Sequence, residues 1–344
     1  MLAANQRFRV LASGIFCLIL TLGIARFAYT PMIPIMFEQV GLTKVLAGWL
    51  ATINYMGYML GALTATLVGN LLIKDRLYRI GLVLAIVTTL MMGLSANPWV
   101  WALSRLLAGL NWSEQWLLLG VVGIIFAIPA WRWLPAPDTS GVTQTGETLK
   151  DHPPSKRFLW LMMFVYFCGG FGFVISATYI VAIVESQETL RGQGEIALLV
   201  LGLAAAPACI IWDLISRKTG ILNALLLAYL LHAAGIILPA LENSLLFALL
   251  SAGLYGFTFV GIVSIVLTMA GRFYPTRPAK LMGTLTMSYG VPQIIAPTIA
   301  GYLAAATGHY NGALYMASGF ILLGAAAIVA IKKWSAEDIR LLSN

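Results

Sequence analysis

Long apolar stretches alternate with short loops along the whole chain. Eleven such runs begin near residues 8, 45, 79, 98, 115, 158, 195, 221, 244, 279 and 310. A helix of about 20 apolar residues crosses the hydrocarbon core of a bilayer. In lipid each run must be helical, because an isolated strand leaves backbone groups unpaired, and a barrel needs alternating patterns of about 10 residues, which the sequence lacks. The pattern therefore predicts an all-α polytopic membrane protein.

The composition supports a membrane environment. Hydrophobic residues make up 60% of the chain and charged residues only 10%. A soluble domain of 344 residues has too little interior to bury that much apolar surface. The first run follows Arg7 and Arg9 and continues to about Met36. It is too long for a signal-peptide core and lacks a small-residue cleavage site, so we expect a retained first helix.

Charge and cysteine usage exclude several classes of function. The net charge of +8 is spread over loops and forms no helix face or groove, which argues against a nucleic-acid partner. The three cysteines, Cys17, Cys168 and Cys209, all lie in apolar runs without metal-ligand spacing or a disulfide framework. We therefore expect no metal, no cofactor and no catalytic residue, and an enzyme is disfavoured.

Basic residues cluster in every second loop, as the positive-inside rule requires of cytoplasmic loops. The basic clusters lie at 74–79, 132–157, 217–218, 272–280 and 332–340. This alternation predicts that both termini are cytoplasmic. Residues 74–79 are expected to form a cytoplasmic turn between the second and third helices.

The alternation fails at one place. The run from Pro98 to Leu110 and the run that begins near residue 115 must both end inside, which requires a crossing between them. The first of these runs is also only about 20 Å long at 1.5 Å per residue, short of a span of about 30 Å. We infer that one transmembrane helix is missing between Leu110 and Asn111. The alternative is a re-entrant helix from Pro98 to Leu110.

A polar segment at 134–157, rich in Pro, Thr, Gly and charge, is predicted to be a cytoplasmic linker. It separates an incomplete N-terminal transmembrane bundle, 1–133, from a C-terminal bundle with a short cytoplasmic tail, 158–344. With the missing crossing restored, about 11 helices become 12, in two six-helix bundles. The segment 23–27 (GIARF) is echoed by 170–174 (GFGFV), which suggests duplication.

Loop motifs give the chain a family resemblance. Asp213, Arg217 and Gly220 resemble the signature between the second and third helices in the major facilitator superfamily. Asp75 and Arg76 belong to a degenerate N-terminal copy with altered spacing. Residues 105–109 (RLLAG) resemble its fourth-helix motif, and residues 23–34 (GIARFAYTPMIP) resemble the first helix of the YbfB/YjiJ branch.

The resemblance implies the major facilitator fold, a location in the bacterial inner (plasma) membrane, and a monomer. It also implies a transporter of a small molecule, with the first and fourth helices of each half lining a central cavity. Two rivals stay open, namely a non-transporting membrane receptor or assembly protein and an intramembrane enzyme.

Two arginines within apolar runs are the foremost candidates for substrate binding. Arg26 and Arg105 are both expected at or above mid-depth, where an unpaired charge is costly and normally faces a cavity. Their forked guanidinium groups suit a carboxylate or phosphate, so the substrate class that they favour is an organic anion. The alternatives are snorkelling of Arg26 toward the outer face and a structural role for Arg105 at helix-end carbonyls.

Other polar residues in the runs carry weaker signals. No Asp or Glu lies deep in any run, so coupling uses a carboxylate in the missing segment, or transport is exchange or facilitated diffusion. A lone His232 and the glycines at 169–172 favour helix packing over ligand binding. Cavity-wall candidates, each as well explained by packing, are Tyr29, Asn54, Tyr58, Tyr179, Tyr255, Thr258, Tyr289 and Gln293.

Overall fold

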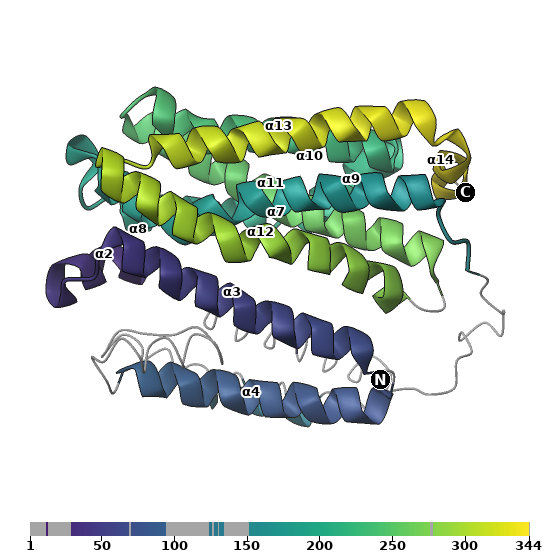
Figure 1. Ribbon diagram of the computed structural model, residues 1–344, viewed down its shortest axis with the longest axis horizontal. Helices are drawn as coiled ribbons and strands as arrows, with labels where there is room; N and C mark the ends of the chain where they lie inside the picture. Colours follow the sequence, from purple (N-terminus) through teal and green to yellow (C-terminus); the bar gives the residue numbers. More distant parts are fainter. Residues whose placement is uncertain are drawn as a thin grey trace. The chain divides into compact units, whose positions relative to one another are not determined.

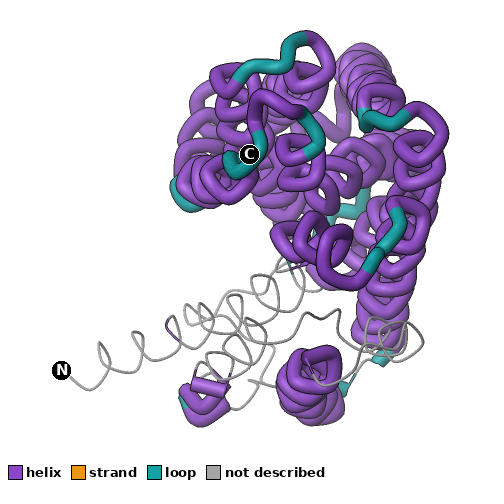
Figure 2. Tube along the Cα trace, turned by 90° about the vertical axis from the view of Figure 1, so that its left-hand side faces the viewer, coloured by secondary structure: helices purple, strands orange, loops and turns teal. Residues whose placement is uncertain are grey.

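The computed structural model describes residue 12 and residues 29–68, 70–93, 124–125, 127–129, 131–133, 151–275 and 278–343. These residues form helices and loops without a strand (Figure 2). The chain divides into two compact units, Met1–Gly141 and Val142–Asn344. The division falls inside the predicted linker.

The described part of the N-terminal unit contains three long helices. These are α2 (Tyr29–Val40), α3 (Lys44–Leu67) and α4 (Leu71–Gly93). The Thr43 side chain caps α3 by accepting a hydrogen bond from the Leu46 amide. The prediction of a turn at 74–79 is wrong, because these residues are helical, while their cytoplasmic location stays a prediction. The basic residues occupy the first turns of α4, since Asn70 Oδ1 accepts from the amides of Leu72 and Ile73 and starts the helix there.

The C-terminal unit is a helical bundle (Figure 1). Its helices are α7 (Lys156–Glu185), α8 (Gly194–Ala205), α9 (Ala208–Thr219), α10 (Ile221–Leu241), α11 (Leu245–Phe273), α12 (Pro278–Thr307), α13 (Asn311–Trp334) and α14 (Ala336–Ser343), with a 3₁₀ turn, η2, at Glu188–Leu190. Within the described residues, α7, α10, α11 and α13 are long and apolar enough to cross a membrane. The pair α8 and α9 makes a fifth candidate span, bent by 45°.

The bend between α8 and α9 lies at Pro207, which caps α9. A proline has no amide hydrogen and its ring crowds the preceding turn, so a helix cannot run through it undisturbed. The sequence pattern predicted one run beginning near residue 195, and the structure makes two helices of it.

Helix α7 passes through the middle of the C-terminal unit and packs against α8, α12 and α13. It is buried along most of its length, and its glycines allow close approach. A Cβ added to Gly170 would lie 2.1 Å from the Tyr289 carbonyl oxygen of α12, and one added to Gly172 would lie 2.3 Å from Ile321 of α13. These contacts confirm that the glycines at 169–172 serve helix packing.

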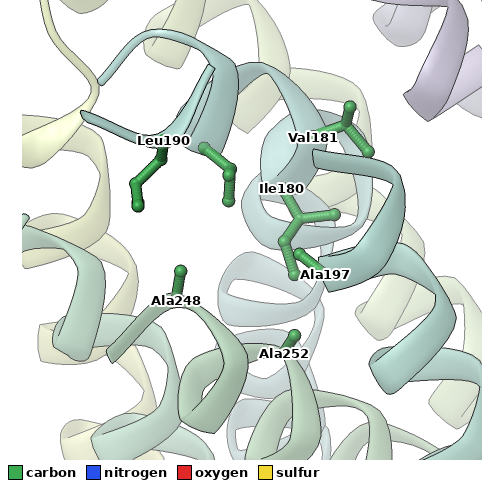
Figure 3. Packing of buried hydrophobic residues seen from close by; sticks show 7 residues of the cluster. Ile180, Val181, Leu190, Ala197, Ala248 and Ala252 are labelled. Carbon is green, nitrogen blue, oxygen red and sulfur yellow. The ribbon is translucent and has the colours of Figure 1, made fainter. Parts of the chain in front are cut away.

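At one end of this bundle, side chains of α7, η2, α8 and α11 pack into an apolar cluster (Figure 3). Ala197, Ala248 and Ala252 supply its small side chains, and Leu190 of η2 covers it. Near the cluster, the Glu185 carboxylate accepts hydrogen bonds of 2.8 Å from the amides of Gly192 and Gly194. A negative charge at a helix N-terminus is favourable, so Glu185 stabilises the start of α8.

Loops far apart in sequence meet at each end of the C-terminal unit. At one end Gln187 donates to the Pro239 carbonyl and Thr189 to the Asn243 carbonyl, so the α7–α8 and α10–α11 loops meet. At the other end the His152 amide donates to the Phe273 carbonyl and Arg272 donates to the Leu342 carbonyl. The end of the linker, the end of α11 and the C-terminal tail, all predicted to be cytoplasmic, therefore share one end.

The exterior of the bundle is apolar. Large side chains such as Leu203, Ile210 and Leu246 are exposed by 65%, 68% and 63%. A soluble monomer rarely exposes so many apolar side chains together, and lipid is the environment that suits them.

Candidate functional site

An aromatic cluster joins the first and fourth helices of the C-terminal unit, α7 and α11, to α12. The Phe173 ring lies 5.5 Å from Phe259 and 5.7 Å from Tyr289, measured between centroids. Tyr166 packs on Tyr289 at 4.5 Å, and Tyr255 on Phe259 at 5.3 Å. Three helices thus present one continuous set of rings, of which Tyr255 and Tyr289 were among the cavity-wall candidates.

The predicted tyrosines also hold the helices together. Tyr255, which is 1% exposed, donates a hydrogen bond of 2.7 Å to the Phe173 carbonyl of α7. Tyr179, which is fully buried, donates one of 3.0 Å to the Pro297 carbonyl of α12. Both hydroxyl hydrogens are used within the unit, so neither hydroxyl group can donate to a ligand in this arrangement.

Gln293 lies on α12 between Pro292 and Pro297 and is fully buried. Its Nε2 donates to the Tyr289 carbonyl at 3.0 Å. Each proline removes an amide donor from α12, which leaves carbonyl groups in this stretch with fewer helical partners. The bond fixes the Gln293 side chain against the backbone of α12, beside the aromatic cluster.

His232 of α10 is a packed residue that bridges two helices, as its isolation in the sequence indicated. Its Nδ1 lies 2.7 Å from Thr258 Oγ1 of α11, and its ring stacks on Tyr255 at 5.2 Å. The Thr258 hydroxyl donates to the Leu254 carbonyl at 2.6 Å, so the histidine must be the donor in the shared bond. Its Nε2 is then a buried acceptor, and no partner for it lies among the described residues.

The loop signature forms a local ion pair at the end of α9. Arg217 Nε lies 2.8 Å from Asp213 Oδ2, one helical turn away, with both side chains exposed. Gly220 ends the helix with φ at +89°, a value that L side chains rarely adopt. The spacing of the signature therefore has a plain physical origin, namely an i,i+4 pair followed by a glycine cap.

In the degenerate N-terminal copy of the loop signature, the ion pair is formed by Arg79 and not by Arg76. Asp75 Oδ2 pairs with Arg79 Nε at 3.0 Å, whereas Arg76 is exposed. Arg79 also donates to the Trp131 carbonyl at 2.9 Å and lies over its ring at 5.1 Å. The same i,i+4 pair thus occurs at the start of the third helix in this unit and at the end of the second helix in the other. The spacing of four residues between Asp75 and Arg79 is the sequence signal that could have predicted this ion pair.

The remaining predicted residues lie apart from these groups. Tyr29 is buried and donates to the Ala47 carbonyl at 3.0 Å, Asn54 is half-buried, and Tyr58 is 38% exposed. Arg26, Arg105 and the junction of Leu110 and Asn111 lie outside the described residues. Their predicted roles stay predictions.

The loops at the end opposite α14 surround a depression of about 370 Å³. Glu188, Asn243, His309 and Asn311 are among its lining residues. It was not predicted, because the three loops that build it are far apart in sequence.

Comparison with known proteins identifies the family. The profile of the family described as "Uncharacterised MFS-type transporter YbfB" matches residues 18–113 and 110–330. The chain belongs to this family. The two matched segments of the YbfB-type chain meet at 110–113, where the charge pattern predicts a missing crossing.

Solved structures show the fold of this YbfB-type transporter. A structure of the nucleoside transporter NupG has a TM-score of 0.68 and 14% identity, covering 96% of this chain and 100% of that one. A point mutant of NupG gives a TM-score of 0.67 and 14% identity, covering 94% and 98%. No curated protein matches. The chain thus has the major facilitator fold and is a multi-pass membrane transporter rather than an enzyme.

Proposed function

We propose that this YbfB-type protein is a secondary-active or facilitative transporter that moves a small organic anion by alternating access. The family match over residues 18–113 and 110–330 carries the proposal. Transporters of such two-bundle build bind substrate near mid-membrane between their halves and rock one bundle against the other. The rigid α7–α11–α12 packing suits the C-terminal unit to move as one body.

The anionic class rests on Arg26 and Arg105. A charge at the centre of a membrane helix costs at least about 2.5–3.5 kcal/mol on insertion scales. No carboxylate lies deep in the apolar runs to offset that cost. An anionic ligand would do so, and a guanidinium can hold a carboxylate or phosphate through two hydrogen bonds.

In this proposal the C-terminal unit contributes ring faces rather than hydroxyl groups. Tyr255, Tyr179 and Gln293 direct their polar atoms at backbone carbonyls. Their proposed role in substrate binding is therefore to hold the aromatic cluster in shape. Asn54 and Tyr58 of α3 are proposed as polar contacts from the N-terminal unit, and Asp75, Arg76, Asp213, Arg217 and Gly220 as a gating motif.

A neutral nucleoside is the second candidate substrate. The aromatic cluster of α7, α11 and α12 favours a flat ring, since aromatic groups stack at the centroid distances seen among these side chains. The similar solved structures are those of a nucleoside transporter. The anion hypothesis requires Arg26 for substrate binding, whereas the nucleoside hypothesis does not.

A ligand screen with Arg26 variants separates the two candidates. We would measure thermal unfolding of the purified chain with mono- and dicarboxylates, organic cations and nucleosides. We expect a carboxylate to raise the midpoint, Arg26→Lys to weaken this effect because the fork is lost, and Arg26→Gln to abolish it. The exposed Arg191 of an outer loop provides the control variant, Arg191→Gln. Unchanged anion affinity in Arg26→Gln would show that Arg26 is structural.

A further inference from the structure

Two helix ends bring basic side chains and tryptophans together at the end of the C-terminal unit that carries α14 (Figure 1). The first turns of α7 and the last turn of α13 lie side by side there, and Arg157 Cζ is 4.7 Å from the centroid of the Trp334 ring. The residues of this surface, called the Trp334 patch below, are all exposed and are Lys156, Arg157, Trp160, Lys332, Lys333 and Trp334.

The tryptophans of the Trp334 patch lie at the ends of two candidate membrane helices. Trp160 is 69% exposed and Trp334 is 52% exposed. Each lies within the terminal turns of a candidate membrane span, Lys156–Glu185 or Asn311–Trp334. Trp160 follows Lys156 and Arg157 by four and three residues, so the three share a helix face. Tryptophan prefers this interfacial level because its ring is apolar and its indole NH is polar.

The buried carboxylate of α14 is hydrogen-bonded to Ser155 and not to the basic side chains of the Trp334 patch. Asp338 of α14 is only 6% exposed, and its two oxygens accept hydrogen bonds from the Ser155 amide at 2.8 Å and the Ser155 hydroxyl at 2.6 Å. Glu337 is exposed and Asp151 is partly buried nearby in sequence. The four basic side chains therefore outnumber the carboxylates that adjoin them.

We infer that the Trp334 patch binds the headgroup of an anionic phospholipid. Basic residues at the membrane surface attract anionic lipids, and pockets between helix ends that carry several of them select phosphate-bearing headgroups. Stacking on Trp334 holds the Arg157 guanidinium in one place, which reduces the entropy lost when it binds a phosphodiester. Trp160 and Trp334 flank the glycerol region of the lipid, and the exposed apolar flanks of α7 and α13 receive its acyl chains.

Thermal unfolding of the purified full chain in neutral detergent tests this inference. Dioleoyl-phosphatidylglycerol is titrated and compared with dioleoyl-phosphatidylcholine and with water-soluble glycerol 3-phosphate. We expect a saturable rise of the unfolding midpoint with phosphatidylglycerol alone. Phosphatidylcholine has acyl chains but no net negative charge, so it tests whether the charge is needed. Glycerol 3-phosphate has the phosphate but no acyl chains, so it tests whether the chains are needed.

Variants assign the effect to the Trp334 patch. The triple change Arg157→Gln, Lys332→Gln, Lys333→Gln should raise the half-saturating lipid concentration at least about tenfold. Trp334→Leu keeps every charge but removes the stacking partner of Arg157, so it should weaken lipid binding as well. Lys218→Gln, at an exposed basic residue of α9, is the matched control and should leave the titration unchanged.

Three results would overturn the inference. The first is an equal response to phosphatidylcholine, which would mean that any lipid stabilises the fold. The second is the same response to glycerol 3-phosphate at the same concentration, which would mean a free-phosphate site. The third is unchanged lipid affinity in both the triple variant and Trp334→Leu, provided that both variants unfold cooperatively in detergent without lipid.

Discussion

Backbone carbonyls accept many of the hydrogen bonds that polar side chains donate within the C-terminal unit. Tyr229 donates to Val165, Ser251 to Gly235, and Ser288 to Met163, each across a helix pair. Such bonds give polar side chains the hydrogen-bond partners that lipid does not offer, and they fix the rotation of one helix relative to the next. They also explain why a polar residue in an apolar run need not face a substrate.

Tyr255→Phe tests whether the Tyr255 hydroxyl serves packing or binding. The change removes the bond to the Phe173 carbonyl and keeps the ring stacked on Phe259. We expect a loss of about 0.6 kcal/mol in the free energy of unfolding, the average for such bonds in membranes. Ligand affinity should stay unchanged, as measured by the shift of the unfolding midpoint with ligand. A large loss of affinity with full stability would place the hydroxyl on the substrate.

Gly256 illustrates close packing between α11 and α8. A Cβ at this position would lie 2.2 Å from the Leu201 carbonyl oxygen, so α8 and α11 must separate if Gly256→Ala is made. We expect a loss of about 1–3 kcal/mol in the free energy of unfolding, typical of overpacking. Gly271→Ala is the matched control on α11, because nothing lies within 4 Å of its added Cβ. Equal stability of the two variants would contradict this account.

Helix positions followed closely from the hydrophobic runs for five long helices of the C-terminal unit. Helices α7, α10, α11, α12 and α13 begin within two residues of their predicted starts. Ser155 and Ser244 cap α7 and α11 through their hydroxyl groups, an arrangement that local sequence determines. Long apolar runs dictate helices in lipid almost regardless of tertiary contacts, which is why this level could be predicted.

Other elements could not be predicted from hydropathy. Pro207 is the sequence signal for the break between α8 and α9. Hydropathy alone does not reveal the break, because the residues on both sides of the proline are apolar. The helix α14 has eight residues, and it forms because Leu342 and Asp338 are buried against the bundle. The hydrogen bonds that occupy Tyr179 and Tyr255 depend on helix rotation, which a single sequence does not encode locally.

Asp338 should determine how firmly α14 is held. Its carboxylate accepts two hydrogen bonds from Ser155, whose own hydroxyl caps α7. We expect Asp338→Ala to remove both hydrogen bonds to Ser155, at a cost of about 1–3 kcal/mol, and to increase amide hydrogen exchange throughout 336–343. Glu337→Ala, at the exposed neighbouring position, is the control. If both variants exchange alike, Asp338 does not anchor the helix.

At the scale of the whole molecule, the chain divides into its two units between Gly141 and Val142, within the polar segment at 134–157. The positive-inside pattern predicts that this segment and the C-terminus are cytoplasmic once a crossing stands between Leu110 and Asn111. The family profile matches the chain in two segments, 18–113 and 110–330, which overlap at the same place.

Cysteine labelling tests the predicted topology. A crossing is restored between Leu110 and Asn111, the native Cys17, Cys168 and Cys209 are replaced by alanine, and one cysteine at a time is placed at Ser140 or Ser343. We expect an impermeant reagent to label neither site in intact cells and both in opened membranes. Labelling of the linker in intact cells would contradict the twelve-helix topology.

Transport by the reconstituted protein is the most direct test of the account. Proteoliposomes are loaded with the ligand that most raises the unfolding midpoint, and entry of the labelled ligand from outside is followed. Alternating access predicts saturable counterflow that disappears in liposomes without protein. A ligand that binds with full occupancy but is never exchanged across the bilayer would contradict the account and favour a membrane receptor.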